Sequence, residues 1–183
     1  SDAMRVLLDA SLDSETLLRL RGIVETEPAV AEIKWITGRN AGRFIFVEAG
    51  VGLRVMGLAQ AQSATQRIEE SIRAAVPHIE RVLIHTEPAT PTHIRYAIPL
   101  SHRTGTISQH FGEAPFFALV TVHRDGGDME EHRILDNPHR TAEKKKGLLV
   151  AEWLVAHKVD LALVKQSLRG KGPAYAFRDA GVM

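Results

Sequence analysis

The chain has 183 residues, of which 44% are hydrophobic and 25% are charged, a composition typical of a soluble globular protein. Its formal net charge is +1, and it has no basic stripe interleaved with aromatic residues, so nothing indicates a nucleic-acid partner. The sequence contains no cysteine, which excludes disulfides and thiolate ligation of a metal or an iron–sulfur cluster.

The chain begins with Ser1-Asp2-Ala3 before Met4, a pattern typical of a cloning remnant, and we exclude residues 1–3 from the fold. No signal peptide follows Met4. The longest apolar runs, such as 115–122, are far shorter than the roughly 20 residues that span a bilayer. These features predict a cytoplasmic location for this chain.

Residues 4–90 have the pattern of a small α/β domain in the order αββαβ. Asp13 is a good N-cap for the first helix, and a turn from Gly38 to Gly42 joins two alternating strands into a hairpin. We expect both helices to cover one face of a small open sheet. The predicted elements are a helix over 14–26, strands over 30–37 and 43–51, a helix over about 56–75 and a strand over 81–85.

A sheet covered on one face leaves its other face open to a partner. Ile45, Val47, Val82 and Ile84 supply apolar side chains either to that open face or to the core. We therefore predict a homodimer formed through this domain, with an interface of about 1,200–2,000 Å² in total.

Five stretches of this half match one known family: Pro28-Ala29-Val30, Gly38 with Gly42, Leu58 with Ala61, Pro77 to Val82, and Ile84 to Pro88. With these spacings the half resembles the cytoplasmic dimerisation domain of cation diffusion facilitators, the membrane exporters of zinc, iron and manganese. The resemblance implies a ferredoxin-like, metallochaperone-like fold and a homodimer. It also implies that a full-length protein lies in the cell membrane, with its own transmembrane domain as a further partner.

The resemblance also implies a metal site at the dimer interface, and its ligand positions are only partly filled. His85 and Glu87 stand at two of these positions, and we name them as candidate metal ligands. Gln62 and Lys34 stand where histidines are found in such domains, and a charged lysine has no lone pair to offer. Since structural zinc takes four ligands, we expect weak zinc binding at most. The alternative is that His85 is a structural residue at a strand end.

Pro88 to Thr92 form a short stiff connector, because each proline fixes φ and disfavours helix before it. Residues 94–183 then give three strands followed by a helix, a strand and a helix, which predicts a mixed-sheet α/β layer structure. Lys144 to Lys146 are expected to form a solvated helix face. The predicted elements are strands over 95–100, 116–123 and 130–135, a helix over about 141–157, a strand over 159–164 and a helix over 174–180.

The most informative motif is His110-Phe111-Gly112, which lies between a polar turn and an apolar strand. A glycine here lets the backbone turn tightly or approach a ligand closely. The motif occurs together with Gly105, Phe116-Phe117, Asn137-Pro138, Val159-Asp160 and a glycine-rich loop before Asp179 to Val182. In these residues the second half resembles the dinitrogenase iron–molybdenum cofactor-binding family. That resemblance implies a ribonuclease H-like fold, in which one more strand usually follows, so we expect the final edge to be incomplete at Met183.

Candidate ligand-binding residues lie where loops leave the predicted sheet, the place at which α/β proteins form ligand crevices. They are His110, Phe111, Gly112, Asn137, His139, Gly170, Lys171 and Gly172. Backbone N–H groups of the Gly170–Gly172 loop would suit an anion. The alternatives are a turn histidine satisfied by backbone and an ordinary strand–helix turn. The ligand stays open between a divalent cation and an iron-containing cluster.

The combined pattern favours a non-enzymatic protein: the cytoplasmic regulatory and dimerisation portion of a metal efflux transporter, with an appended domain for a metal-containing ligand. A second hypothesis is a free-standing carrier of an iron-containing cluster related to nitrogenase cofactor assembly. A hydrolase of the ribonuclease H kind needs clustered carboxylates for two metal ions, and Asp136, Asp160 and Asp179 form no such pair in a strand centre.

Overall fold

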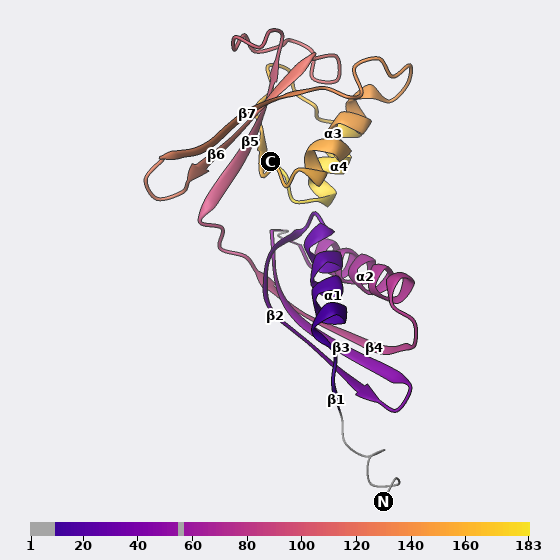
Figure 1. Ribbon diagram of the computed structural model, residues 1–183. Helices are drawn as coiled ribbons and strands as arrows, with labels where there is room; N and C mark the ends of the chain where they lie inside the picture. The colour runs from indigo at the N-terminus through magenta and orange to yellow at the C-terminus, as the bar shows by residue number, and fades with distance from the viewer. Residues whose placement is uncertain (1–9, 55–56) are drawn as a thin grey trace, which may run out of the picture. The chain divides into compact units, whose positions relative to one another are not determined.

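The computed structural model describes residues 10–54 and 57–183. The chain separates into two compact units, residues 1–90 and 91–183. Among the described residues each unit has one four-stranded sheet and two helices (Figure 1). The predicted class, two successive α/β folds, is therefore confirmed, whereas residues 1–3 lie outside the described part of the chain.

The first unit has the predicted αββαβ order, extended by a short additional strand at its start. Its sheet order is β1-β2-β3-β4, antiparallel except for the parallel pair β3–β4. The β2–β3 hairpin closes at Ala41 and Phe44, since Gly42 turns the chain with a φ of +64°. The turn is thus shorter than the predicted 38–42. The elements are β1 (Ala10–Ser11), α1 (Ser14–Thr26), β2 (Val30–Ala41), β3 (Phe44–Leu53), α2 (Leu58–Ala75) and β4 (Ile79–Pro88).

Helix α1 begins where the sequence predicts, because Asp13 caps it. The Asp13 carboxylate accepts hydrogen bonds from the Thr16 N–H at 2.8 Å and the Thr16 hydroxyl at 2.7 Å. These two bonds stabilise the ionised form and lower the pKa of Asp13.

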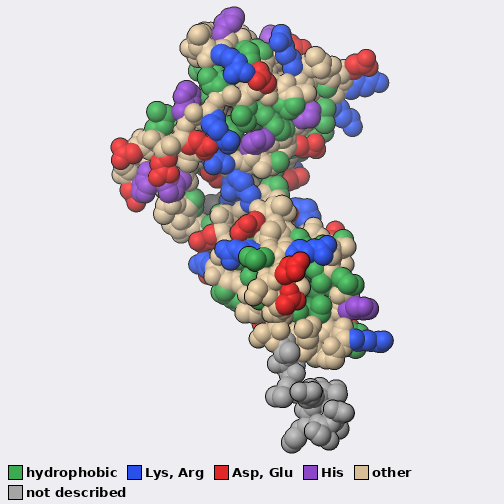
Figure 2. All heavy atoms as spheres, in the orientation of Figure 1, with side chains coloured by type: hydrophobic (Ala, Val, Ile, Leu, Met, Phe, Trp, Pro, Cys, Tyr) green, Lys and Arg blue, Asp and Glu red, His purple; other side chains and the backbone are tan. Residues whose placement is uncertain are grey.

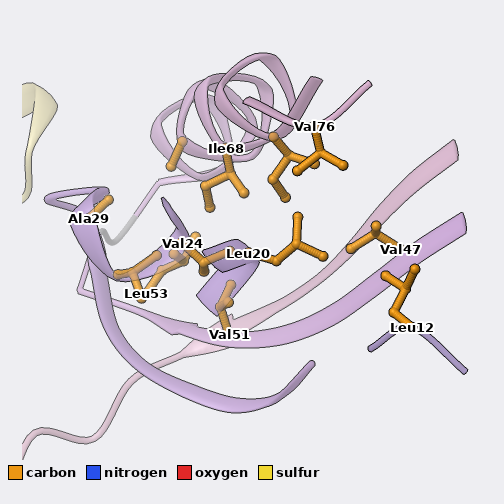
Figure 3. Close-up of a cluster of buried hydrophobic side chains, with 12 residues drawn as sticks. Leu12, Leu20, Val24, Ala29, Val47, Val51, Leu53, Ile68 and Val76 are labelled. Atoms are coloured by element: carbon orange, nitrogen blue, oxygen red, sulfur yellow. The ribbon is translucent and has the colours of Figure 1, made fainter. Parts of the chain in front are cut away.

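The core of the first unit lies between the two helices and one face of the sheet, as Figure 3 shows. Leu20 and Val24 of α1 and Ile68 of α2 point toward Val47 and Val51 of β3. Ile45, Val82 and Ile84 pack against this same cluster. The four apolar residues that sequence left between core and open face therefore belong to the core.

The second unit is the predicted mixed sheet with two helices. Its strand order is β7-β6-β5-β8, with β5–β6 and β6–β7 antiparallel and β5–β8 parallel, the arrangement expected of a ribonuclease H-like fold. The elements are β5 (His93–Leu100), β6 (Phe116–His123), β7 (Met129–Asp136), α3 (Lys146–Ala156), β8 (Leu161–Ala162) and α4 (Gly172–Asp179).

Two elements of this unit are shorter than predicted. Helix α3 begins at Lys146 rather than near residue 141, because Lys145 takes a left-handed φ of +56° that a helix cannot contain. Strand β8 covers two residues rather than 159–164. Hydrogen bonds from the N–H groups of Asp160 and Leu163 to β5 nevertheless extend its attachment on both sides.

The far edge of β8 is also paired. The Met183 N–H donates to the Asp160 carbonyl at 3.0 Å, and the Ala162 N–H donates to the Met183 carbonyl at 2.7 Å. Met183 thus pairs with the outer edge of β8 through these two hydrogen bonds. No helix among the described residues has the length and apolar character needed to cross a bilayer.

Candidate functional site

A cavity of about 300 Å³ opens in the second unit beside the His110-Phe111-Gly112 motif. Its walls come from the loop 108–113, from the first residues of α3 and from the segment 164–173 before and at the start of α4. Of the residues predicted from sequence, the structure brings His110, Phe111, Gly112 and Lys171 into this one cavity.

Buried neighbours hold the backbone on both sides of His110. The Ser108 N–H donates to the Pro99 carbonyl at 2.8 Å, and the Ser108 hydroxyl donates to the His110 carbonyl at 3.1 Å. On the other side, the Phe111 ring is buried and packs edge-on against Phe117 and Phe177 at centroid distances of 5.6 and 5.7 Å. Phe111 thus anchors the loop in the core, while the side chain of His110 remains exposed at the cavity.

Gly112 allows the motif to lie directly against the N-terminus of α3. A Cβ at this position would stand 2.8 Å from the Gly147 backbone nitrogen and 3.0 Å from its Cα. The close approach predicted for this glycine is therefore an approach to backbone, and only a residue without a side chain fits. It places His110 beside the first turn of a helix.

Asn137 holds the same loop from the end of β7. Its side-chain amide donates to the Ala114 carbonyl at 2.8 Å and to the Gly112 carbonyl at 3.3 Å, and its side-chain oxygen accepts from the His139 N–H at 2.9 Å. The side chain is buried and does not line the cavity, and neither does His139. Asn137 is thus placed to position the motif rather than to touch a ligand.

The cavity is rich in positive charge. Lys146, Lys165 and Lys171 line it, against one carboxylate, that of Glu113. No described side chain caps the N-terminus of α3, so the N–H groups of its first turn carry the partial positive charge of the helix dipole toward the cavity. The arrangement favours an anionic ligand.

The glycine loop contributes less than the sequence suggested. The Lys171 N–H donates to the Leu168 carbonyl at 3.0 Å, so it serves the turn rather than an anion. Gly170, with a φ of +76°, and Gly172 do not line the cavity. Lys146 and Lys165 line the cavity but are not among the residues predicted from sequence. The sequence predicts Lys146 in a solvated helix face. The helix instead begins at Lys146, directly after the left-handed backbone of Lys145.

The two metal candidates of the first unit lie on the open face of its sheet. His85 and Glu87 pair with Gly50 and Gly52 of β3, so both side chains project from the same face of β4. The His85 ring stands 5.4 Å from the Trp35 ring, and the Glu87 carboxylate forms an ion pair with the Lys34 ammonium. The Lys34 ammonium is also 4.0 Å from Glu32. The Glu87 carboxylate, which a metal ion would need as a ligand, is therefore already paired with a lysine cation.

Two protein families match the chain. Residues 12–89 match the family described as "Cation efflux protein, cytoplasmic domain", and residues 93–183 match the one described as "Dinitrogenase iron-molybdenum cofactor". The chain joins a cation efflux cytoplasmic domain to a dinitrogenase iron-molybdenum cofactor domain. In these terms, the open sheet face belongs to the cation efflux domain and the cavity at His110 to the cofactor domain.

Solved structures similar to part of the chain include forms of MamM CTD. The cadmium form of an aspartate-to-glutamate variant is 18% identical, covers 42% of this chain and 98% of its own, and has a TM-score of 0.40. A histidine-to-alanine variant is 16% identical, covers 43% of this chain and 100% of its own, and has a TM-score of 0.41. A comparison with curated proteins finds no match.

Proposed function

We propose that this chain is the cytoplasmic regulatory and dimerisation portion of a metal efflux transporter, whose second unit holds a metal-containing anion. The two family matches support a role in metal handling. The observation that carries the ligand assignment is the cavity at His110, in which one imidazole faces a lining of three lysines and one glutamate.

The chemistry of the lining suits binding better than catalysis. Because the chain has no cysteine, an iron-containing cluster would be ligated through the imidazole of His110. Lys146, Lys165 and Lys171 would balance the negative charge of such a cluster or of an oxyanion without forming metal bonds. The cavity contains a single carboxylate, Glu113, so it lacks the carboxylate pair of a two-metal hydrolase.

The experiment that tests this assignment compares His110→Ala with the unchanged chain after anaerobic purification. We expect His110→Ala to lose the visible absorption of the metal-containing ligand bound in this cavity, while the thermal unfolding midpoint stays nearly constant, because His110 is exposed at a loop. His139→Ala is the matched control, since His139 lies outside the cavity and should keep the ligand. Equal visible absorption per folded molecule in His110→Ala would contradict the proposal.

The transporter and the free-standing carrier differ in what precedes this chain in its gene. Transmembrane helices encoded immediately upstream of Met4 support the transporter. An upstream stop codon supports a free-standing carrier of a metal cluster. The His110 experiment applies to both, because the cavity lies entirely within the second unit.

A further inference from the structure

We propose that His93, His123 and Glu130 form a second metal site, specific for a divalent ion of the zinc type, in the second unit and separate from the cavity at His110. All three residues lie near the free end of the β6–β7 hairpin, where Figure 2 shows histidine and acidic side chains gathered together. None of them lines the cavity at His110.

The sheet register brings the two histidines together. His93 opens β5 and His123 ends β6, and they are direct partners in the antiparallel pair. Their ring centroids are 4.9 Å apart with an interplanar angle of 82°. Two imidazoles from neighbouring strands thus lie on one face of the sheet within reach of a common ion.

A bulge in β7 brings the carboxylate to them. Thr121 pairs with Glu131 and Val122 pairs with Met129, so Glu130 is the extra residue between two ladder pairs. A bulge re-aims the side chain it carries. Here the Glu130 carboxylate reaches the His93 ring, with Oε1 at 2.9 Å from Nε2.

The contact between His93 and Glu130 is close but is not a hydrogen bond. His93 Nε2 is buried and forms no directed hydrogen bond with any described residue, although the Glu130 oxygen is close. Two ligands that bind a tetrahedral zinc ion at about 2.0–2.1 Å stand about 3.3–3.4 Å apart. The observed separation of 2.9 Å is shorter than this, so the two groups would move apart slightly to bind an ion between them.

The other nitrogen of His93 is already oriented. Its Nδ1 lies 2.7 Å from the Thr92 hydroxyl. Histidines that ligate metals through one nitrogen are usually held by a hydrogen bond at the other, which fixes the ring and its tautomer. With Nδ1 protonated toward Thr92, Nε2 carries the lone pair and is available to a cation, which the nearby carboxylate would also attract.

His123 supplies the third ligand by turning its ring. Within residues 10–54 and 57–183, no three histidine or acidic side chains already surround a common point, so one donor has to move. Besides its edge contact with the His93 ring, the ring of His123 accepts one long hydrogen bond from the described residues, 3.4 Å from the Asp125 N–H to its Nδ1. Rotation of this ring completes a site of two imidazoles and a carboxylate, which suits zinc, with water in the remaining position.

The test is a calorimetric titration of the metal-free full chain with zinc chloride near neutral pH. We expect one zinc ion at this site, with affinity reduced about tenfold or more in each of His93→Ala, His123→Ala and Glu130→Gln. His132→Ala is the matched control, because His132 is exposed on β7, the strand that carries Glu130, and pairs with Val120 rather than with the two histidines. His85→Ala and His110→Ala should keep this zinc ion, which separates the site from the first unit and from the cavity.

Lowering the pH from about 7.5 to about 6 should weaken this binding, because zinc has to displace protons from imidazole. His123→Gln serves as a second variant if His123→Ala unfolds, as judged by circular dichroism. Absence of zinc binding to the unchanged chain would overturn the proposal. So would zinc binding of equal affinity in folded His93→Ala and His123 variants.

Discussion

Gly112 occupies a position where one added methyl group meets backbone atoms on the neighbouring helix. In Gly112→Ala the new Cβ would stand 2.8 Å from the Gly147 nitrogen, and neither backbone can move without shifting α3. We expect a loss of about 1–3 kcal/mol in the free energy of unfolding, as for other overpacked sites, measured by urea denaturation. Gly126→Ala is the control, since its Cβ would meet only the flexible Asp128 side chain at 3.2 Å. Equal stability of the two variants would show that α3 is not packed against the motif.

Lys34 lies beside the candidate metal ligand Glu87 in the first unit. Its ammonium forms an ion pair with Glu87 and lies 4.0 Å from Glu32 on the face that also carries His85. We expect Lys34→Ala to gain zinc binding, because it frees two carboxylates beside an imidazole, whereas Lys34→Arg retains the cation and should gain none. Calorimetry in a His93→Ala background removes the second unit's proposed site from the measurement. Unchanged zinc binding in Lys34→Ala would mean that these side chains do not converge on an ion.

The sequence predicts the role of a residue where that role follows from the chemistry of its own side chain, and not where it depends on contacts made by the fold. The lysine at position 34 could be recognised as an unsuitable ligand from its chemistry alone, since it lacks a lone pair. The role of Asn137 could not, because its three side-chain contacts join it to backbone more than twenty residues away and to its own turn. The cationic lining was likewise hidden, because Lys165 and Lys146 are far apart in sequence and meet only through the fold.

At the scale of elements, the loop that carries His110 depends on the end of strand β7. Asn137→Ala leaves the carbonyls of Gly112 and Ala114 without their side-chain donor in a buried setting. We expect a loss of about 1–3 kcal/mol, the usual cost of unsatisfied buried polar groups. Hydrogen exchange should increase in residues 108–115, while the elements of the first unit keep their protection. Faster exchange throughout both units would indicate a general loss of folding rather than release of this loop.

The elements found from sequence are those whose signals are local. Helix α1 has its capping aspartate and apolar spacing in adjacent residues, and its bounds are as predicted. The predicted helix over about 141–157 is longer than α3, because nothing in a run of three lysines indicates that the backbone of Lys145 is left-handed. The predicted strand over 159–164 is longer than β8, because an apolar run does not show how many of its residues pair with the neighbouring strand β5.

At the scale of the whole molecule, the open face of the first sheet is the surface on which we expect a second copy to dock. Trp35 is 41% exposed there and lies against Gly50, where no Cβ intervenes. Burial of such an aromatic ring contributes strongly to an interface. We expect Trp35→Glu to shift the chain from dimer to monomer at micromolar concentration in multi-angle light scattering.

Leu18→Glu provides the comparison for the dimer, because Leu18 is 69% exposed on α1, on the helical side of the sheet. This variant should remain dimeric. A monomeric unchanged chain, or loss of the dimer in Leu18→Glu alone, would place the interface elsewhere.

The ion pair between Lys34 and Glu87 has one consequence for how such a protein responds to its surroundings. A metal ion bound between carboxylates dissociates when its free concentration falls, and chelators remove it. An ammonium group on a side chain is present in every molecule, so the ion pair that it forms does not depend on the metal concentration. We therefore expect the first unit to stay in one state through metal scarcity and excess, and any response to metal to originate in the histidines of the second unit.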